Sequence, residues 1–570
     1  MEIRFDTYYD NDDLNARLQW LAEQYPQIVE LQSLGTSYEG RDIPLVVLTN
    51  RETGPALEKP GFWIDGNIHA TELTASMAAL FFLVTATKKY GTDPKVTRIL
   101  DEQVIYVVPR LNPDGAALAL HAQPQFIRSG TRPYPYEEKQ EGLHQEDVDG
   151  DGRILQMRIE DPAGDWKISD RDPRLMIKRR PDDEGGTYYR ILPEGLIENY
   201  DGHIITTARP LQGLDFNRNF PGSWRPEGEQ SGAGDFPGSE PEIRAVIEFM
   251  AKHPNIYGAI TYHTFSRAIL RPYGGKSDDE MDSNDLWVFE AIGERGTEIT
   301  DYPTVSVFHN FKYHPKEVIT GVFDDWLYDH KGVFAFTVEL WDLATAAGVE
   351  SKKKEKKFIE WFRKHPLEDD YKVLDFVNAH ASESLVAWRE VEHPQLGKVE
   401  IGGWDNLYTW RNPPHSLLEP EIAPQAEFAI SFASLAPRLK WRDVEVTPLG
   451  DGRYHVLAVV ENEGFLPTYG SNQAKKMKAA RPVRLELTLP EGAIIQSGKP
   501  KQEVGHLEGR SNKLGVMSTW TVSQTDNRGK AEWLIHAPQG GTLTLHVMSE
   551  RAGTLHRDVQ LGASDSDGTA

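Results

Sequence analysis

The sequence predicts an α/β fold, with a mixed central sheet flanked by helices, followed by an all-β, sandwich-like region. In the first part of the chain, apolar runs of strand length alternate with segments of helical spacing, which is typical of a parallel or mixed sheet. Near residue 425 this alternation gives way to short strands separated by turns. The length of 570 residues exceeds what one hydrophobic core normally holds, so we expect several domains.

The elements of the α/β part follow from the spacing of apolar residues. Leucines at helical spacing predict a helix over 12–26, and a capping-box pattern opens a second helix at 239–253. A buried helix is expected within the apolar segment 74–91. Runs of β-forming residues predict strands at 28–34, 43–49, 62–66, 104–109, 256–263 and 333–340.

Two segments interrupt this rhythm and define the expected domain organisation. Residues 129–213 are rich in Pro, Gly, Asp and Arg, and we interpret them as a long insertion into a catalytic domain that covers 1–380. A linker is expected at 381–424, and a β-sandwich-like accessory domain at 425–570. Its short strands are expected at 426–433, 453–464, 483–489 and 541–548, and the tail 561–570 is expected to be disordered.

The composition narrows the function classes. A formal net charge of -25 repels phosphate backbones, so we expect no nucleic-acid partner. The chain has no cysteine, which excludes disulfides, thiolate metal sites and cysteine nucleophiles. The N-terminus lacks an apolar signal-like core and no long apolar stretch follows, so we expect no membrane segment. As written, the protein is expected in the cytoplasm, or outside the cell if a signal was removed.

Three candidate metal ligands follow predicted strands. His69 and Glu72 form an H-x-x-E pattern after the strand at 62–66, and His263 ends the strand at 256–263. Catalytic zinc takes three protein ligands and leaves one position for water, so this combination would suit it. Taken singly, each residue is more often a surface or strand-end side chain, and Glu72 is also favourable near a helix N-terminus.

Further candidates would complete a hydrolytic site. Glu339 lies in an apolar strand, where a carboxylate is costly unless it acts as a base, although a residue leaving the core at a strand end is the alternative. The pair Asn217 and Arg218 could bind a carboxylate. Arg128 could stabilise an oxyanion. Each arginine alone would more often be a solvated surface residue.

The order of these motifs changes their interpretation. After the H-x-x-E come LNPDG at 111–115, DFNRNF at 215–220, YHTFSRAILRPYG at 262–274 and FAFTVELWD at 334–342. In this order the sequence resembles the zinc carboxypeptidases of the pancreatic carboxypeptidase A/B superfamily. The resemblance covers about 5–345 and extends toward 380.

The resemblance implies a zinc-dependent exopeptidase that cleaves the C-terminal peptide bond by metal-activated water. It implies one zinc ion per chain, a peptide substrate with a free C-terminal carboxylate, and the following roles. The metal ligands would be His69, Glu72 and His263, the base Glu339, the oxyanion group Arg128, and the carboxylate-binding pair Asn217 and Arg218.

This sequence also departs from the family pattern. The spacing of Arg128 from the preceding motif differs slightly from the family pattern, so Arg132 is the runner-up for the oxyanion role. Thr71 stands where the family usually has a substrate-binding arginine. Alignment places Glu317 at the family's mobile tyrosine, with Tyr313 four residues earlier. The insertion between the substrate-binding motifs is expected at the rim of the cleft, where it could narrow or extend the subsites.

Asp324 carries the prediction on specificity. In the family, the residue before the Asp-Trp pair lies at the base of the pocket for the C-terminal side chain, and here that residue is Asp324. A buried carboxylate there would select Lys or Arg. The alternative is broad or apolar specificity, with Asp324 as a solvated loop residue.

The insertion holds a possible calcium loop. Asp147, Asp149 and Asp151 stand at positions 1, 3 and 5 of an EF-hand-like pattern. Its twelfth position is Arg158 instead of Glu, and Glu160 could replace it only in an altered loop. The alternative is an acidic turn without metal.

The sequence motifs are also compatible with other functions. A zinc amidohydrolase that deacylates acylated amino acids, or a peptidase of cell-wall stem peptides, would carry similar ligands. A catalytically dead peptide-binding module, with the β domain as the active partner, is a third alternative. Such a module would lack a metal ligand or the base, yet the three ligand positions and the base position are all filled.

Overall fold

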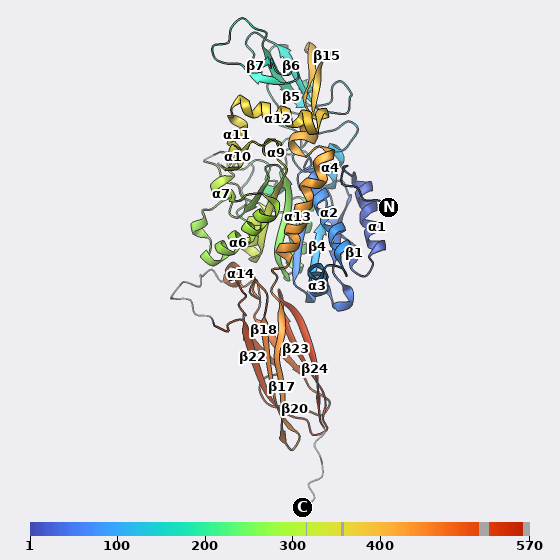
Figure 1. The fold of residues 1–570 in the computed structure, drawn as a ribbon, viewed down its shortest axis with the longest axis vertical. Coiled ribbons are helices and arrows are strands. Elements are labelled where there is room, and N and C mark those ends of the chain that lie inside the picture. The colour runs from blue at the N-terminus through green and yellow to red at the C-terminus, as the bar shows by residue number, and fades with distance from the viewer. Residues whose placement is uncertain (315, 355–357, 512–523, 563–570) are drawn as a thin grey trace, which may run out of the picture.

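The computed structural model describes residues 1–314, 316–354, 358–511 and 524–562. Figure 1 shows an elongated molecule with an α/β body in the middle, a small β-rich lobe at one end and a β-sandwich at the other. Most of the predicted tail, 563–570, lies outside the described residues.

A mixed eight-stranded sheet forms the centre of the body, in the order β1-β2-β4-β3-β11-β14-β12-β13. The pairs β4–β3, β3–β11, β11–β14 and β12–β13 are parallel, whereas the pairs β1–β2, β2–β4 and β12–β14 are antiparallel. Every residue of β3, β4 and β11 is buried, which explains their continuous apolar runs. The strands are β1 (Val29–Thr36), β2 (Asp42–Leu48), β3 (Gly61–Gly66), β4 (Val104–Val108), β11 (Ile256–Thr264), β12 (Ala268–Arg271), β13 (Thr304–Ser306) and β14 (Phe334–Leu340).

Helices cover both faces of this sheet, and each face has its own hydrophobic core. One core includes residues of α1 (Asn11–Gln24), α2 (Leu73–Lys89), α3 (Pro94–Glu102), α6 (Ser283–Thr300) and α13 (Leu418–Ala433). The other includes residues of α5 (Pro241–Lys252) and α8 (Phe323–Lys331). The predicted fold class, a mixed sheet flanked by helices, is confirmed.

The segment expected as a linker, 381–424, is structured instead. It contains strands β15 (Leu385–His393) and β16 (Gly397–Trp404) and the start of α13, and α13 also covers the strand expected at 426–433. This helix packs against α2 and α6 and contributes Phe428 and Phe432 to the core. Because α13 is largely buried, its apolar run has no clear helical period, which is why it resembled a strand.

The lobe joins two segments that are far apart in the sequence. Strands from the insertion and the expected linker form one six-stranded sheet, in the order β15-β16-β6-β9-β7-β8. The contributing insertion strands are β6 (Gln156–Glu160), β7 (Trp166–Ile168), β8 (Met176–Lys178) and β9 (Tyr189–Pro193), beside a separate pair of β5 (Gly142–Gln145) and β10 (Gly195–Glu198). At the junction of β6 and β16, Arg158 forms a 2.8 Å ion pair with Glu400.

The C-terminal region consists of two four-stranded sheets around a common core. The first contains β17 (Leu439–Gly450), β18 (Arg453–Asn462), β22 (Arg528–His536) and β20 (Ile494–Ser497), and the second contains β21 (Lys501–Gly505), β19 (Val483–Thr488), β23 (Gly541–Ser549) and β24 (Gly553–Leu561). Buried Arg551 joins this region to the body by donating to the carbonyl of Gly332 at the end of α8, at 2.8 Å.

The remaining helices are short, apart from α12 (Leu367–His380). They are α4 (Pro113–Ala119), α7 (Val307–Asn310), α9 (Leu343–Ala346), α10 (Glu350–Lys354), α11 (Glu360–Arg363) and α14 (Asn472–Met477). Among the described residues, no helix combines the length and the apolar character that crossing a bilayer requires.

Candidate metal centre and substrate cleft

The sheet topology brings the candidate ligands to one edge. Strands β3, β11 and β14 are adjacent and parallel, so their carboxyl ends meet at the same side. His69 and Glu72 lie in the turn between β3 and α2, and His263 is the penultimate residue of β11. Glu339 pairs in register with His263 on the neighbouring strand, so the two side chains leave the sheet next to each other.

The His–Glu–His cluster has the dimensions of a metal site. His69 Nδ1 lies 2.9 Å from Glu72 Oε1, His263 Nδ1 lies 3.1 Å from Glu72 Oε2, and the two Nδ1 atoms are 3.1 Å apart. All three residues are at most 2% exposed. Zinc with ligands at 2.0–2.1 Å in tetrahedral arrangement separates its ligand atoms by roughly 3.3 Å. The donor set therefore fits a single zinc ion.

Asp215 orients the first ligand, and the sequence analysis missed this role. Its Oδ1 lies 3.1 Å from His69 Nε2, which leaves Nδ1 facing the cluster. Burial alone would raise the pKa of Glu72, but the imidazoles of His69 and His263 lower it well below its usual value. Glu72 is therefore ionised, as a metal ligand must be. Its place in the sequence could have indicated this role, because Asp215 is the first residue of the DFNRNF motif.

Glu339 has the environment of a general base. Its Oε2 atom is buried and accepts no hydrogen bond from the described residues. Burial raises the pKa of Glu339 to about 7, and the nearby His263 opposes this effect. A carboxylate with a pKa close to neutrality can both accept and release a proton at physiological pH.

The structure distinguishes the two arginine candidates for the oxyanion role. Arg128 Nη1 lies 3.2 Å from Glu72 Oε1, and its Nε donates to Asp215 Oδ2 at 2.9 Å. These carboxylates raise the pKa of Arg128 although its burial acts in the opposite direction. The guanidinium of Arg132 instead pairs with Glu240 at 2.7 Å. Arg128, not Arg132, therefore lies beside the candidate metal ligands.

The Asn217–Arg218 pair lies in the short helical turn Phe216–Arg218, directly after Asp215. Asn217 accepts a hydrogen bond from the backbone N–H of Phe323 at 3.0 Å, which ties the turn to α8. Arg218 Nη2 lies 3.9 Å from Asp215 Oδ2, so one carboxylate connects His69, Arg128 and Arg218. This arrangement places two guanidinium groups where they could bind an anionic end of a ligand.

The side chain of Asp324 is buried near Glu339 and is not solvated. Its Oδ2 accepts a hydrogen bond from Thr337 Oγ1 at 3.2 Å, and Thr337 lies two residues before Glu339 on the same face of β14. Burial raises the pKa of Asp324. No lysine or arginine among the described residues forms an ion pair with it.

Neither Tyr313 nor Glu317, the two alternatives for the mobile tyrosine, forms a side-chain hydrogen bond with the candidate ligands in the described part of the chain. The side chain of Tyr313 is exposed. Glu317 is exposed, and its backbone N–H donates to the carbonyl of His314.

Side chains of the protein contact the carboxylates and the backbone of the predicted calcium loop. Asp147, Asp149 and Asp151 can bring ligand atoms within 4.8 Å of one another. However, Arg389 of β15 donates to Asp149 and, at 2.7 Å, to Asp151. Buried Glu194 accepts from the backbone N–H groups of Val148 and Leu155, both at 2.8 Å, and so closes the loop from inside.

The fold and the cluster together define a candidate metal site at the carboxyl edge of a mixed sheet. A family model described as zinc carboxypeptidase matches residues 14–358, which is more than half of the chain. The chain therefore belongs to the zinc carboxypeptidase family, as the motifs predicted, and this family implies zinc at the cluster. A second family model, described as a domain of unknown function, matches residues 438–560 in the β-sandwich.

Individual relatives are distant. Carboxypeptidase A1 of Mus musculus is 23% identical over 346 residues, which are 60% of this chain and 64% of that protein. Carboxypeptidase B2 of Homo sapiens is 24% identical over 355 residues, with the same shares. A crystal structure of thrombin activatable fibrinolysis inhibitor covers 75% of this chain and 74% of its own, with 17% identity and a TM-score of 0.43. The chain thus spans 64% of the length of these curated relatives.

Proposed function

We propose that this chain is a zinc-dependent carboxypeptidase that hydrolyses the last peptide bond of a peptide. The observation that carries the proposal is the convergence of His69, Glu72 and His263 on one point, with Glu339 in register beside His263. Zinc bound there would polarise the peptide carbonyl and lower the pKa of a water molecule toward 7.

Glu339 would move the proton in both halves of the reaction. Its buried carboxylate accepts a proton from the attacking water, and then donates it to the nitrogen of the leaving amino acid. The pKa of about 7 supports both steps, because neither transfer is strongly uphill near neutral pH.

The arginines would bind charge on either side of the scissile bond. Arg128, next to Glu72, stabilises the oxyanion that forms as the carbonyl is attacked. Asn217 and Arg218 hold the free C-terminal carboxylate, which confines cleavage to the end of the chain.

Asp324 would determine the preferred C-terminal residue. Its carboxylate is buried on the same face as Thr337 and Glu339 and forms no ion pair with a lysine or arginine of the described residues. A substrate Lys or Arg side chain would supply one, whereas an apolar side chain would leave the carboxylate without a partner. We therefore propose a preference for basic C-terminal residues.

Calcium binding at the acidic loop stays a prediction. Arg389 would compete with the ion for the carboxylates. An ion would have to displace the guanidinium from Asp149 and Asp151, or bind beside it.

A panel of dipeptides and tripeptides that differ in the C-terminal residue, assayed with and without a chelator, tests the proposed activity. We expect release of the last amino acid, its loss on chelation, and its recovery with zinc. N-acyl amino acids and stem peptides belong in the same panel. Faster hydrolysis of an N-acyl amino acid than of every peptide would favour the deacylase alternative, and turnover unaffected by the chelator would contradict the proposal.

A further inference from the structure

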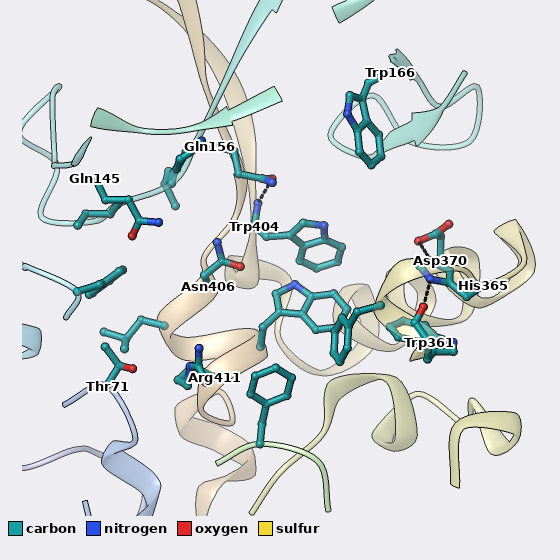
Figure 2. Close-up of a pocket in the computed structure, with 18 residues that line it drawn as sticks. Thr71, Gln145, Gln156, Trp166, Trp361, His365, Asp370, Trp404, Asn406 and Arg411 are labelled. Carbon is teal, nitrogen blue, oxygen red and sulfur yellow. Dashed lines mark hydrogen bonds and ion pairs between the residues drawn. The ribbon is translucent and has the colours of Figure 1, made fainter. Parts of the chain in front are cut away.

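A large cavity adjoins the metal centre and extends under the lobe. It has a volume of about 550 Å³, and we call it the aromatic basin. Its aromatic lining includes Phe126, Trp166, Phe265, Trp361, Trp404 and Trp410. Figure 2 shows Trp404 near the middle of the site, Trp166 across the basin on the lobe, and Thr71 at the opposite side.

The basin begins beside the candidate metal ligands. Thr71, which lies between the ligands His69 and Glu72, lines it, and so does Phe265, two residues after His263. A scissile bond must lie at the metal, and the Asn217–Arg218 pair is proposed to hold the C-terminal side. The part of the substrate that precedes the scissile bond must therefore leave in another direction, and the basin is the cavity that begins at the metal-bearing turn.

The chemistry of the basin favours aromatic side chains. Among the described residues that line it, one carboxylate occurs, Asp370, and it is already paired with His365 at 3.0 Å. The other polar groups include the neutral amides Gln145 and Gln156. Pockets lined by aromatic rings with a few amides bind flat apolar groups and fix their orientation by hydrogen bonds.

Arg411 stands at the inner edge of the basin. It ends the helical turn Asn406–Arg411, and its guanidinium carbon lies 4.9 Å from the ring centre of Phe265. Burial lowers the pKa of Arg411, and the charge of Arg128 acts in the same direction, whereas the charges of Glu72 and Glu339 oppose it. Its guanidinium forms no hydrogen bond or ion pair within the described part of the chain. A partly buried guanidinium with free donors suits an acceptor supplied by a ligand.

The turn that carries Arg411 is fixed to the metal centre. The side chain of Asn412 donates to the carbonyl of Thr71 at 2.8 Å and accepts from the backbone N–H of Thr74 at 2.9 Å. Trp341, just after β14, donates its indole N–H to the carbonyl of Thr409 at 2.7 Å. The inner edge of the basin is thus preorganised relative to the ligands.

We propose that the aromatic basin binds aromatic side chains of the substrate residues that precede the scissile bond, and that Arg411 donates to a backbone carbonyl of the same residues. This inference rests on the proposed carboxypeptidase function. Trp361, Trp404, Trp410 and Arg411 all lie beyond the matched range 14–358, so this side of the basin comes from the part of the chain outside the family match. The opposite side, with Thr71 and Trp166, lies within the matched range.

The first test compares two pentapeptides with the same last two residues, one with Phe and one with Gly at the two preceding positions. We expect the wild type to prefer the Phe peptide in kcat/KM by about 10- to 100-fold, the effect of burying an aromatic ring. Trp166→Ala and Trp410→Ala should each reduce this ratio by about 5-fold or more. Tyr136→Ala, which removes an exposed aromatic residue of the insertion outside the basin, is the matched control and should keep the ratio.

The second test addresses Arg411. Arg411→Met removes no hydrogen bond within the described residues, so we expect a folded protein with full zinc content. Its kcat/KM on both pentapeptides should fall by about 10- to 100-fold through a higher KM, and Arg411→Lys should recover part of the loss. Wild-type kinetics in Arg411→Met, or a loss of zinc in that variant, would contradict a role in substrate binding.

The outcomes separate the two levels of the proposal. Hydrolysis of both pentapeptides at equal rates would overturn the basin subsite while leaving the carboxypeptidase intact. Hydrolysis of neither would overturn the proposed function itself. Equilibrium binding to Glu339→Gln provides a readout without turnover, and tighter binding of the Phe peptide than of the Gly peptide would support the basin there. A sugar-bearing peptide that binds more tightly than the Phe peptide would contradict the assignment to aromatic side chains.

Discussion

Two clusters in this protein have the residue types of a metal site, and they differ in what surrounds them. At the edge of the central sheet, His69, Glu72 and His263 are buried and direct their donor atoms toward one point. In the lobe, Asp147, Asp149 and Asp151 are partly exposed, and Arg389 neutralises two of them. Arg128 contacts only Glu72 in the first cluster and leaves both imidazoles free of a cation, whereas Arg389 contacts two of the three carboxylates in the second. Buried donors of mixed type that converge on one point therefore distinguish the first cluster from the second.

The backbone that carries each cluster accounts for this difference. Parallel strands fix the positions of the catalytic ligands before any ion binds, because the register of β3, β11 and β14 is set by the core. The acidic loop is closed by Glu194 and Arg389, so its conformation needs no ion. A metal is therefore expected to matter greatly at the first cluster and little at the second.

Removing a ligand from the first cluster should have the largest effect. His263→Ala leaves two ligands, so we expect the zinc content to fall to a small fraction and activity to drop below detection. Elemental analysis of the purified variant measures the loss. His455→Ala, on the exposed surface of the sandwich, is the control. Full zinc retention in His263→Ala would remove the distinction between the clusters.

Removing the base should separate chemistry from metal binding. Glu339→Gln keeps the shape of the side chain but cannot accept a proton, so kcat should fall by about 10²- to 10⁴-fold with zinc still bound. Near-normal turnover in this variant would assign the proton transfer to another group.

Asp324 provides an intermediate case, a buried carboxylate that forms no ion pair with any described lysine or arginine. If it pairs with a substrate side chain, Asp324→Ala should lower the ratio of kcat/KM for a peptide ending in Arg to one ending in Phe by about 10-fold or more. An unchanged ratio would show that this carboxylate does not face the substrate. The Phe peptide serves as the internal control.

The acidic loop should give the smallest effect. For metal-stripped wild type, we expect added calcium to raise Tm by at most a few degrees, because Arg389 competes for two of the three carboxylates. Arg389→Ala frees them and should enlarge the increase measured by thermal unfolding. If calcium changes Tm in neither protein, the loop is an acidic turn without metal.

The sequence predicted the catalytic half of the molecule more completely than the lobe. Buried strands such as β11 carry continuous apolar runs, so a polar residue near the end of such a run is recognisable in the sequence. This pattern predicts both His263 and Glu339, and the structure pairs them in register. Their roles stay predictions, although the structure brings them together. The family assignment and the fold class are confirmed.

What escaped prediction depends on contacts between distant segments. The pairing of β16 with β6, for example Glu400 opposite Arg158, leaves no periodic signal in either strand. Arg411 is a single arginine far from every motif, and only the folded chain places it beside Thr71. The prediction of a linker at 381–424 missed its strands and helix for the same reason. Elements that pair with remote parts of the chain show no regular apolar pattern in their own sequence.

The shared sheet of the lobe has a consequence for dissecting this protein. Deleting the insertion alone would remove β6 and leave β16 with an unpaired edge, and exposed edges of this kind promote aggregation. The insertion and the segment Leu385–Trp404 are therefore one module encoded in two pieces. An exchange of substrate preference between related enzymes would have to transplant both pieces at once.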